Sequence, residues 1–183
     1  MQYLKVPKDR VGALIGKKGE TKQMIEERTG ILIDVDSETG EVTIDTEKAN
    51  DPVMGLKVME FVRAIGRGFS PERAYKLFEE DAFLQGFDIR DYTGKNPKHV
   101  RRMRARLIGS KGKTRRLIEE LTNTEVSIYG NTVYIIGSML ELSLAQNAID
   151  MILSGSEHAA VYRFLEGKQK DLKISRLDYI ETE

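Results

Sequence analysis

The chain has 183 residues, 40% of them hydrophobic and 32% charged, which is the composition of a globular protein with one medium domain or two small ones. Its 29 basic and 29 acidic residues cancel, so net charge attracts no polyanion, and the absence of cysteine excludes disulfides and thiolate metal sites. No apolar run approaches the ~20 residues of a membrane span, and the N-terminal MQYLKVPKDR lacks a secretory signal pattern. We expect a cytoplasmic protein that does not contact membranes.

The first half of the chain contains LIGKKGETKQMIEERT, residues 14–29, in which two glycines three apart precede a helical stretch. The patterns that follow predict a strand over 31–35, a turn over 37–40 and an alternating strand with Val42 and Ile44. Asp51 followed by Pro52 predicts the start of a long helix, since Asp caps helices and proline suits the first helical position. The apolar stripe of this helix is Val58, Phe61, Val62 and Ile65.

The second half repeats this order after a basic segment, KHVRRMRARL, which reads as an amphipathic helix with Val100, Met103 and Leu107 on its apolar face. LIGSKGKTRRLIEELT, residues 107–122, comes next. It is followed by a predicted strand over 126–129, a turn at 130–131, a strand with Val133 and Ile135, and a helix with the stripe Ala145, Ala148, Ile149 and Ile152. Ser138 with Glu141 three residues later predicts a capping box at the start of that helix.

The two sixteen-residue stretches align without a gap at ten identical positions, and Gly109 follows Gly16 by 93 residues. A period of half the chain indicates two copies of one unit and not a solenoid. Each copy reads as β-α-α-β-β-α, an α+β arrangement, with one more helix after it, over 70–81 and 156–170. We therefore predict two domains, residues 1–82 and 83–183.

The segment from 109 to 114 allows two interpretations. Gly112-Lys113-Thr114 resembles the end of a nucleotide-binding P-loop, but that pattern needs a glycine where Leu107 stands and a strand where the basic helix is predicted. Two glycines three apart between two helices instead make a turn whose outer face has no Cβ, so that a sugar-phosphate backbone can approach the helix N-terminus. The first copy keeps the glycines without the P-loop lysine, which favours the second interpretation.

The repeated LIGxxGxTxxxIExxT, followed by a hairpin and a long helix, resembles the type I KH domain, which clamps about four single-stranded nucleotides at its GXXG loop. This resemblance implies tandem domains, each with a three-stranded antiparallel sheet and helices on one face. Lys22 and Arg115 stand where most KH domains have an aliphatic residue. With the Thr before them and the Ile-Glu after them, they are similar to the Krr/Pno type of paired KH proteins, which are small-ribosomal-subunit assembly factors. The intact loop of residues 16–19 resembles that of an archaeal member. The resemblance implies ribosomal RNA near its 3′ end as the ligand and a Nob-type endonuclease or another ribosome-assembly protein as a partner.

The expected RNA-binding residues come from the two loops, the isoleucines before them, the residues after them and the basic helix. They are Ile15, Gly16, Lys17, Lys18, Gly19, Lys22, Arg101, Arg102, Arg106, Ile108, Gly109, Ser110, Lys111, Gly112, Lys113 and Arg115. Residues 95–118 hold ten Lys or Arg and no acid, so we expect the second domain to bind RNA more strongly, with the basic side chains of the helix turned outward.

Catalysis and cofactors have no support in the pattern. His99 and His158 stand alone, and no metal cluster, triad or paired carboxylate motif is visible. Two alternatives to RNA binding remain: a protein-protein scaffold that uses the acidic stretch 34–51 and the extra helices, and, more remotely, a P-loop-like NTPase.

Overall fold

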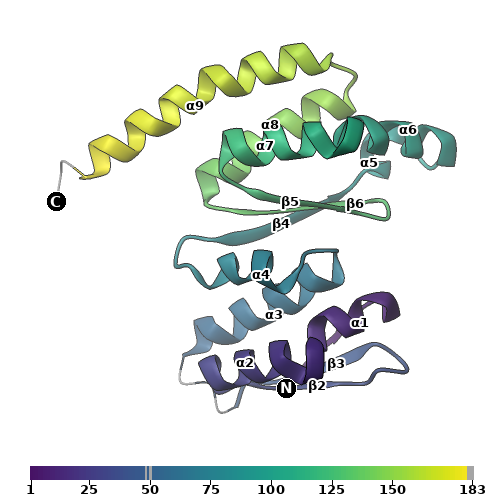
Figure 1. Cartoon of the computed structure of the whole chain (residues 1–183), viewed down its shortest axis with the longest axis vertical. Helices are drawn as coiled ribbons and strands as arrows, with labels where there is room; N and C mark the ends of the chain where they lie inside the picture. Colours follow the sequence, from purple (N-terminus) through teal and green to yellow (C-terminus); the bar gives the residue numbers. More distant parts are fainter. Residues whose placement is uncertain (48, 50, 181–183) are drawn as a thin grey trace. The chain divides into compact units, whose positions relative to one another are not determined.

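The structure is a computed structural model that describes residues 1–47, 49 and 51–180 (Figure 1). The chain divides between Leu84 and Gln85 into two compact units, which we call unit 1 and unit 2. Each unit contains one three-stranded sheet. In the described ranges, no helix combines the length and the apolar content needed to cross a bilayer.

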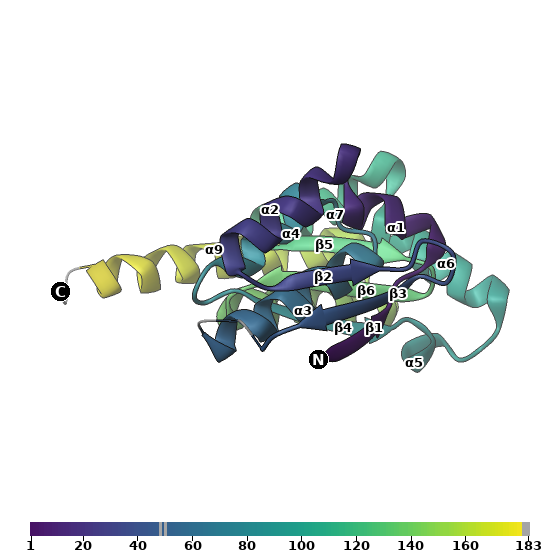
Figure 2. The ribbon, with the colours of Figure 1, turned by 90° about the horizontal axis from the view of Figure 1, so that it is seen from below.

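Unit 1 has the predicted order of strands and helices. Its elements are β1 (Gln2–Lys5), α1 (Lys8–Ile15), a 3-10 turn (Lys17–Gly19), α2 (Glu20–Thr29), β2 (Leu32–Val35), β3 (Glu41–Asp45) and α3 (Pro52–Gly66). The central strand β3 pairs antiparallel with β1 and β2, which are therefore the sheet's edges (Figure 2). The pairs Leu4↔Val42 and Ile33↔Ile44 define the register.

The core of unit 1 confirms the sequence pattern. The four stripe residues of α3 and the strand residues Val42 and Ile44 are completely buried. The Asp51 carboxylate accepts a hydrogen bond from the backbone N–H of Val53 at 2.9 Å, with Pro52 in the first turn, as the Asp-Pro pair predicts.

Unit 2 has the same order with an addition. Its elements are β4 (Phe83–Asp88), α5 (Arg90–Thr93), α6 (Pro97–Ile108), a 3-10 turn (Ser110–Gly112), α7 (Lys113–Thr122), β5 (Glu125–Tyr129), β6 (Thr132–Gly137), α8 (Met139–Leu153) and α9 (His158–Ile180). The strand order is β4-β6-β5, and the helices α6, α7 and α8 lie on one side of the sheet (Figure 1). The predicted capping box is present: Ser138 N–H donates to Glu141 Oε2 at 2.9 Å and Glu141 N–H donates to Ser138 Oγ.

The basic helix α6 is held in the core of unit 2 by its apolar stripe. Val100, Met103 and Leu107 are at most 5% exposed and pack with Ile118 of α7 and Ile149 of α8. The predicted amphipathic helix is thereby confirmed, and its remaining side chains lie at the surface of the unit or along its edges.

The segment after α3 differs from the expected helix over 70–81. A short α4 (Pro71–Ala74) continues as a 3-10 turn (Tyr75–Phe78) and ends there. In a 3-10 turn, side chains three apart point the same way, and Tyr75 and Phe78 both pack on Phe61, with ring centroids 5.2 and 5.5 Å away. In unit 2 the corresponding helix, α9, runs past the expected end at 170.

A second difference lies between the first strand and the first long helix. In unit 1, Val6 and Pro7 alone join β1 to α1, whereas in unit 2 the segment 89–96, which includes α5, joins β4 to α6. The Tyr92 hydroxyl of this segment donates a hydrogen bond to the Asp150 carboxylate of α8 and accepts one from Gln146 at 3.1 Å. Burial and the bond to Asp150 raise the pKa of Tyr92 to about 12.

Candidate nucleic-acid interface

The two GXXG turns have nearly the same backbone. Gly16 has φ 79° and ψ 173°, Lys18 has φ 56°, and Gly19 has φ 82°; their counterparts Gly109, Lys111 and Gly112 have φ 75°, 52° and 75°. The conformation of Gly16 and Gly109 is one that only glycine adopts readily. The repeat in the sequence is therefore a repeat of one unusual loop conformation.

The first glycine of each loop packs against the threonine two residues after the second glycine, and this contact leaves no room for a side chain. A Cβ on Gly109 would lie 2.3 Å from Thr114 Oγ1 and 2.7 Å from the Thr114 nitrogen, and a Cβ on Gly16 would meet Thr21 at the same distances. Both threonines are buried. Close packing of the loop on the following helix, as well as the turn itself, requires glycine here.

The hydroxyl of Thr114 has a hydrogen-bond partner on α9. It lies 2.9 Å from the hydroxyl of Tyr162, whose ring stacks on His158. In the segment after α3, Tyr75 with Glu79 matches the spacing of Tyr162 with Glu166 in α9. The Tyr75 hydroxyl is buried without a hydrogen-bond partner among the described residues, and burial raises its pKa. The loop of unit 2 thus has a polar support that the loop of unit 1 lacks.

The helices that follow the loops present unblocked N-termini. The N-cap residues of α2 and α7 are Gly19 and Gly112, and neither helix has a side chain that caps its first turn. The first backbone N–H groups of a helix have no partner within the helix and carry the positive end of its dipole. A helix end of this kind suits an anionic group that approaches past the two glycines of the loop.

The charge around the two loops differs. In unit 2, Lys111, Lys113 and Arg116 are exposed, and a Cβ on Gly112 would lie 3.1 Å from Arg116 Nη1, so this guanidinium lies against the loop. Positively charged groups that surround an open helix N-terminus suit a phosphodiester backbone.

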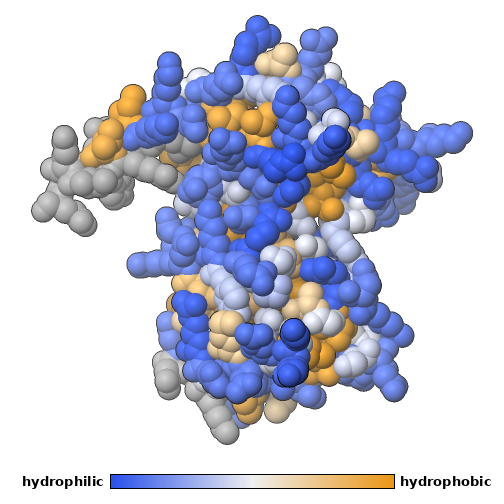
Figure 3. All heavy atoms as spheres, viewed as in Figure 1, coloured by the Kyte–Doolittle hydropathy of each residue, from blue (hydrophilic) through white to orange (hydrophobic). Residues whose placement is uncertain are grey.

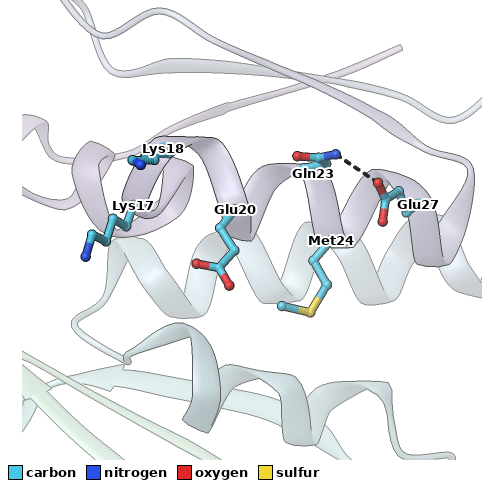
Figure 4. A pocket seen from close by; sticks show the side chains of 6 residues that line it. All are labelled: Lys17, Lys18, Glu20, Gln23, Met24 and Glu27. Carbon is cyan, nitrogen blue, oxygen red and sulfur yellow. Dashed lines mark hydrogen bonds between the residues drawn. The ribbon is translucent and has the colours of Figure 1, made fainter.

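In unit 1, Glu20 stands at the position of Lys113 and Gln23 at the position of Arg116. A hollow of about 620 Å³ beside the loop is lined by Lys17, Lys18, Glu20, Gln23, Met24 and Glu27 (Figure 4). Glu20 projects into the space beside Lys17, and Gln23 donates a hydrogen bond to Glu27 at 2.9 Å. These carboxylates offset the positive charge of the two lysines.

Lys22 and Arg115 have partners within the protein. Lys22 Nζ lies 3.5 Å from Glu26, and Arg115 Nη1 lies 3.0 Å from both oxygens of Glu119. Each glutamate in turn accepts a backbone N–H from the edge strand, that of Ile33 or of Val126, at 2.9 and 2.8 Å. These pairs join the helix after each loop to the strand beside it, which explains the recurring Ile-Glu of the repeat.

Arg106 does not point outward as the sequence pattern predicts. Its guanidinium donates to the carbonyl oxygens of Ile152 and Ser156 at 2.8 and 2.5 Å, at the end of α8. Arg10 does the same in unit 1, with Ile65 and Phe69 at 2.8 and 2.6 Å. Carbonyls at a helix C-terminus lack partners within the helix and favour a cation. The alignment of the repeats does not reveal this equivalence because Arg10 and Arg106 lie one helical turn apart relative to the loops.

The other expected residues lie at the ends of the helices before the two loops or on α6. Ile108 and its counterpart Ile15 end the helices before the loops and are half-buried, while Arg101 and Arg102 are exposed on α6. Arg102 contacts His99 at 3.2 Å. Around α5 and α6, at the upper right of Figure 3, the surface is largely hydrophilic.

The residues described contain no group of three His, Asp or Glu side chains that could hold a metal ion. The loop of unit 2 follows a helix, α6, whereas a P-loop follows a buried strand. The geometry suits a nucleic-acid backbone and does not match that of a P-loop.

Comparison with known proteins agrees with this geometry. Residues 84–170 match the family model of the eukaryotic type KH domain (KH-domain type I), and residues 1–51 match the KH domain model. The chain is 45% identical to a KH domain-containing protein of Methanocaldococcus jannaschii, over 97% of this chain and 78% of that protein. The chain belongs to the KH-domain family.

Two further relatives have names that refer to ribosomal RNA. In the crystal structure of an a/eIF2alpha–aDim2p–rRNA complex from Pyrococcus horikoshii, one chain is 47% identical with a TM-score of 0.86, and the match covers 93% of this chain and 94% of that one. The pre-rRNA-processing protein pno1 of Aspergillus fumigatus is 35% identical. The match covers 56% of this chain and 42% of that relative.

Proposed function

We propose that this protein binds single-stranded RNA through its two GXXG loops, and that the loop of unit 2 makes the stronger contact. The observation that carries the proposal is the unblocked N-terminus of α7, with exposed Lys111, Lys113 and Arg116 around a loop that begins and ends with glycine. Phosphate groups fit this arrangement, and bases then turn toward the edge strand β5.

The strand's hydrogen-bonding groups favour this orientation. In the hairpin that ends at Tyr129↔Thr132, alternate residues of β5 bond to β6, and Val126 and Ile128 direct their backbone N–H and C=O groups toward the open edge. The N–H of Val126 is occupied by Glu119, so the groups of Ile128 are the ones that we assign to base contacts.

Ribosomal RNA is the target that we propose. A relative is named for pre-rRNA processing and another is part of a complex with rRNA. Similarity to the Krr/Pno type narrows the proposal to small-subunit RNA near its 3′ end during ribosome assembly, with a Nob-type endonuclease as a candidate partner. The proposed role is binding and not catalysis.

The test replaces the two exposed residues inside the unit 2 loop, Ser110→Asp with Lys111→Asp. We expect affinity for labelled single-stranded RNA to fall at least tenfold, because two carboxylates then face the phosphates, while circular dichroism and thermal unfolding stay close to those of the wild type. Wild-type binding should weaken with salt, with a log-log slope of roughly −0.7 for each phosphate contact on a single strand. A folded variant that binds RNA like the wild type would remove this loop from the mechanism.

A further inference from the structure

A second basic feature of unit 2 lies apart from the GXXG loop. A hollow of about 380 Å³, which we call the α5–α6 hollow, is formed between α5, the start of α6 and the β5–β6 turn. Its lining residues are Arg90, Lys95, Pro97, Val100, Arg101, Arg104 and Asn131. Four of these side chains are cationic and none is acidic.

The cations of the hollow differ in how far they are engaged. The Arg90 guanidinium is paired with Asp88, with Nη2 2.6 Å from Oδ2, and Arg104 Nη1 donates to the carbonyl of Gly130 at 3.0 Å. Within the described chain, no hydrogen bond or ion pair engages Lys95 or Arg101, and both are exposed. Two cations of the hollow are therefore fixed by neighbours and two are free for a ligand.

The wall of the hollow is firmly placed. Tyr92 ties α5 to α8 through Asp150 and Gln146, and its ring packs edge-on against Phe87 at 5.7 Å. Asn96 caps α6 by accepting the N–H of Lys98 at 3.0 Å. A wall held in this way keeps the cations in position before a ligand arrives, which reduces the entropic cost of binding.

One face of α6 leads from the hollow to the proposed RNA site. Arg101, Arg104 and Ile108 follow one another at i, i+3 and i+7, so they form one stripe along α6 that ends at the loop. At a rise of about 1.5 Å per residue, Arg101 is about 12 Å from Gly109 along the helix. Unit 1 has no counterpart of the α5 segment, since only Val6 and Pro7 lie between β1 and α1.

We infer that the α5–α6 hollow binds a phosphodiester group of the same RNA strand, beyond the nucleotides held at the Gly109–Gly112 loop. The inference rests on the proposed function and extends it, because unit 2 then holds a longer strand than one loop alone. Lys95 and Arg101 supply the direct phosphate contacts, while Arg104 positions the β5–β6 turn. An anion fits because the charged side chains of the lining are all cationic, and its other residues are the neutral Asn131, Pro97 and Val100.

The experiment measures the affinity of the full chain for randomised single-stranded RNA of four and of ten nucleotides. The hollow variant is Lys95→Gln with Arg101→Gln, and the matched control is Lys98→Gln with Arg163→Gln, which removes two exposed cations of unit 2 that lie outside the hollow and outside the expected RNA site. We expect the hollow variant to bind the ten-nucleotide RNA about tenfold more weakly than the control, and its log-log salt slope should be smaller by roughly 0.7 for each phosphate that it no longer binds. Both variants should bind the four-nucleotide RNA alike.

The outcomes separate the two proposals. If the hollow variant and the control bind the longer RNA equally well, the hollow is not part of the RNA site. That result leaves the proposal for the Gly109–Gly112 loop unchanged. If the wild type binds neither RNA, the proposed function fails and the inference fails with it.

Discussion

The residue that follows the second loop glycine is Glu20 in unit 1 and Lys113 in unit 2, and three residues later Gln23 corresponds to Arg116. The loops themselves agree within a few degrees in φ. In both units the first glycine packs on a threonine, an arginine holds the end of the third long helix, and a glutamate joins the loop helix to the edge strand. The two units therefore share what shapes the loop, while the charge that faces a ligand has diverged.

The largest effect on stability should come from the shared glycine. Gly109→Ala and Gly16→Ala each put a Cβ 2.3 Å from a buried threonine oxygen. The backbone strain adds to this overlap, and we expect each variant to lose about 2–5 kcal/mol of unfolding free energy. Chemical denaturation measures this loss.

Gly19→Ala is the matched control for the glycine variants, because a Cβ there meets nothing within 4 Å and only the positive φ of 82° is unfavourable. It should cost about 1–2 kcal/mol. A loss at Gly109 no larger than the loss at Gly19 would contradict the packing argument.

A smaller and equal effect is expected for the two arginines that hold helix ends. Arg10→Gln and Arg106→Gln each leave two carbonyls without their cation, and each should lower the unfolding free energy by about 1–3 kcal/mol. Under conditions where both variants are folded, RNA affinity should stay within about twofold of the wild type, since neither guanidinium is free.

Arg102→Gln provides the comparison for the arginine variants, because Arg102 is exposed on the same helix and should affect stability little. A strong loss of RNA affinity in a folded Arg106→Gln protein would restore Arg106 to the RNA site, where the sequence pattern alone places it.

The fold was predictable because its signals are local. The Asp51-Pro52 start, the Ser138–Glu141 capping box and the apolar stripes of α3, α6 and α8 are set by neighbouring residues along the chain, and each is found in the structure. Both GXXG loops were also predictable, because each lies within one continuous stretch of sixteen residues that the chain repeats.

The side-chain partners were less predictable because they depend on contacts between distant residues. Arg106 reaches Ile152 and Ser156, about half of unit 2 away in sequence, and periodicity alone could not separate it from Arg101 and Arg102. The 3-10 turn after α4 packs Tyr75 and Phe78 on Phe61, a contact between distant residues that no local pattern encodes. The i,i+4 spacing of Arg115 and Glu119 was a signal that could have identified their ion pair.

Exchanging the divergent charges tests the central claim most directly. Lys113→Glu with Arg116→Gln gives unit 2 the side chains of unit 1, and Glu20→Lys with Gln23→Arg makes the reverse exchange. Affinity for single-stranded RNA, measured over a range of salt concentrations, should fall about tenfold for the first protein, which corresponds to about 1.4 kcal/mol. It should rise for the second. Equal affinities and salt slopes for both exchanged proteins and the wild type would contradict the claim that unit 2 holds RNA through the charge around its loop.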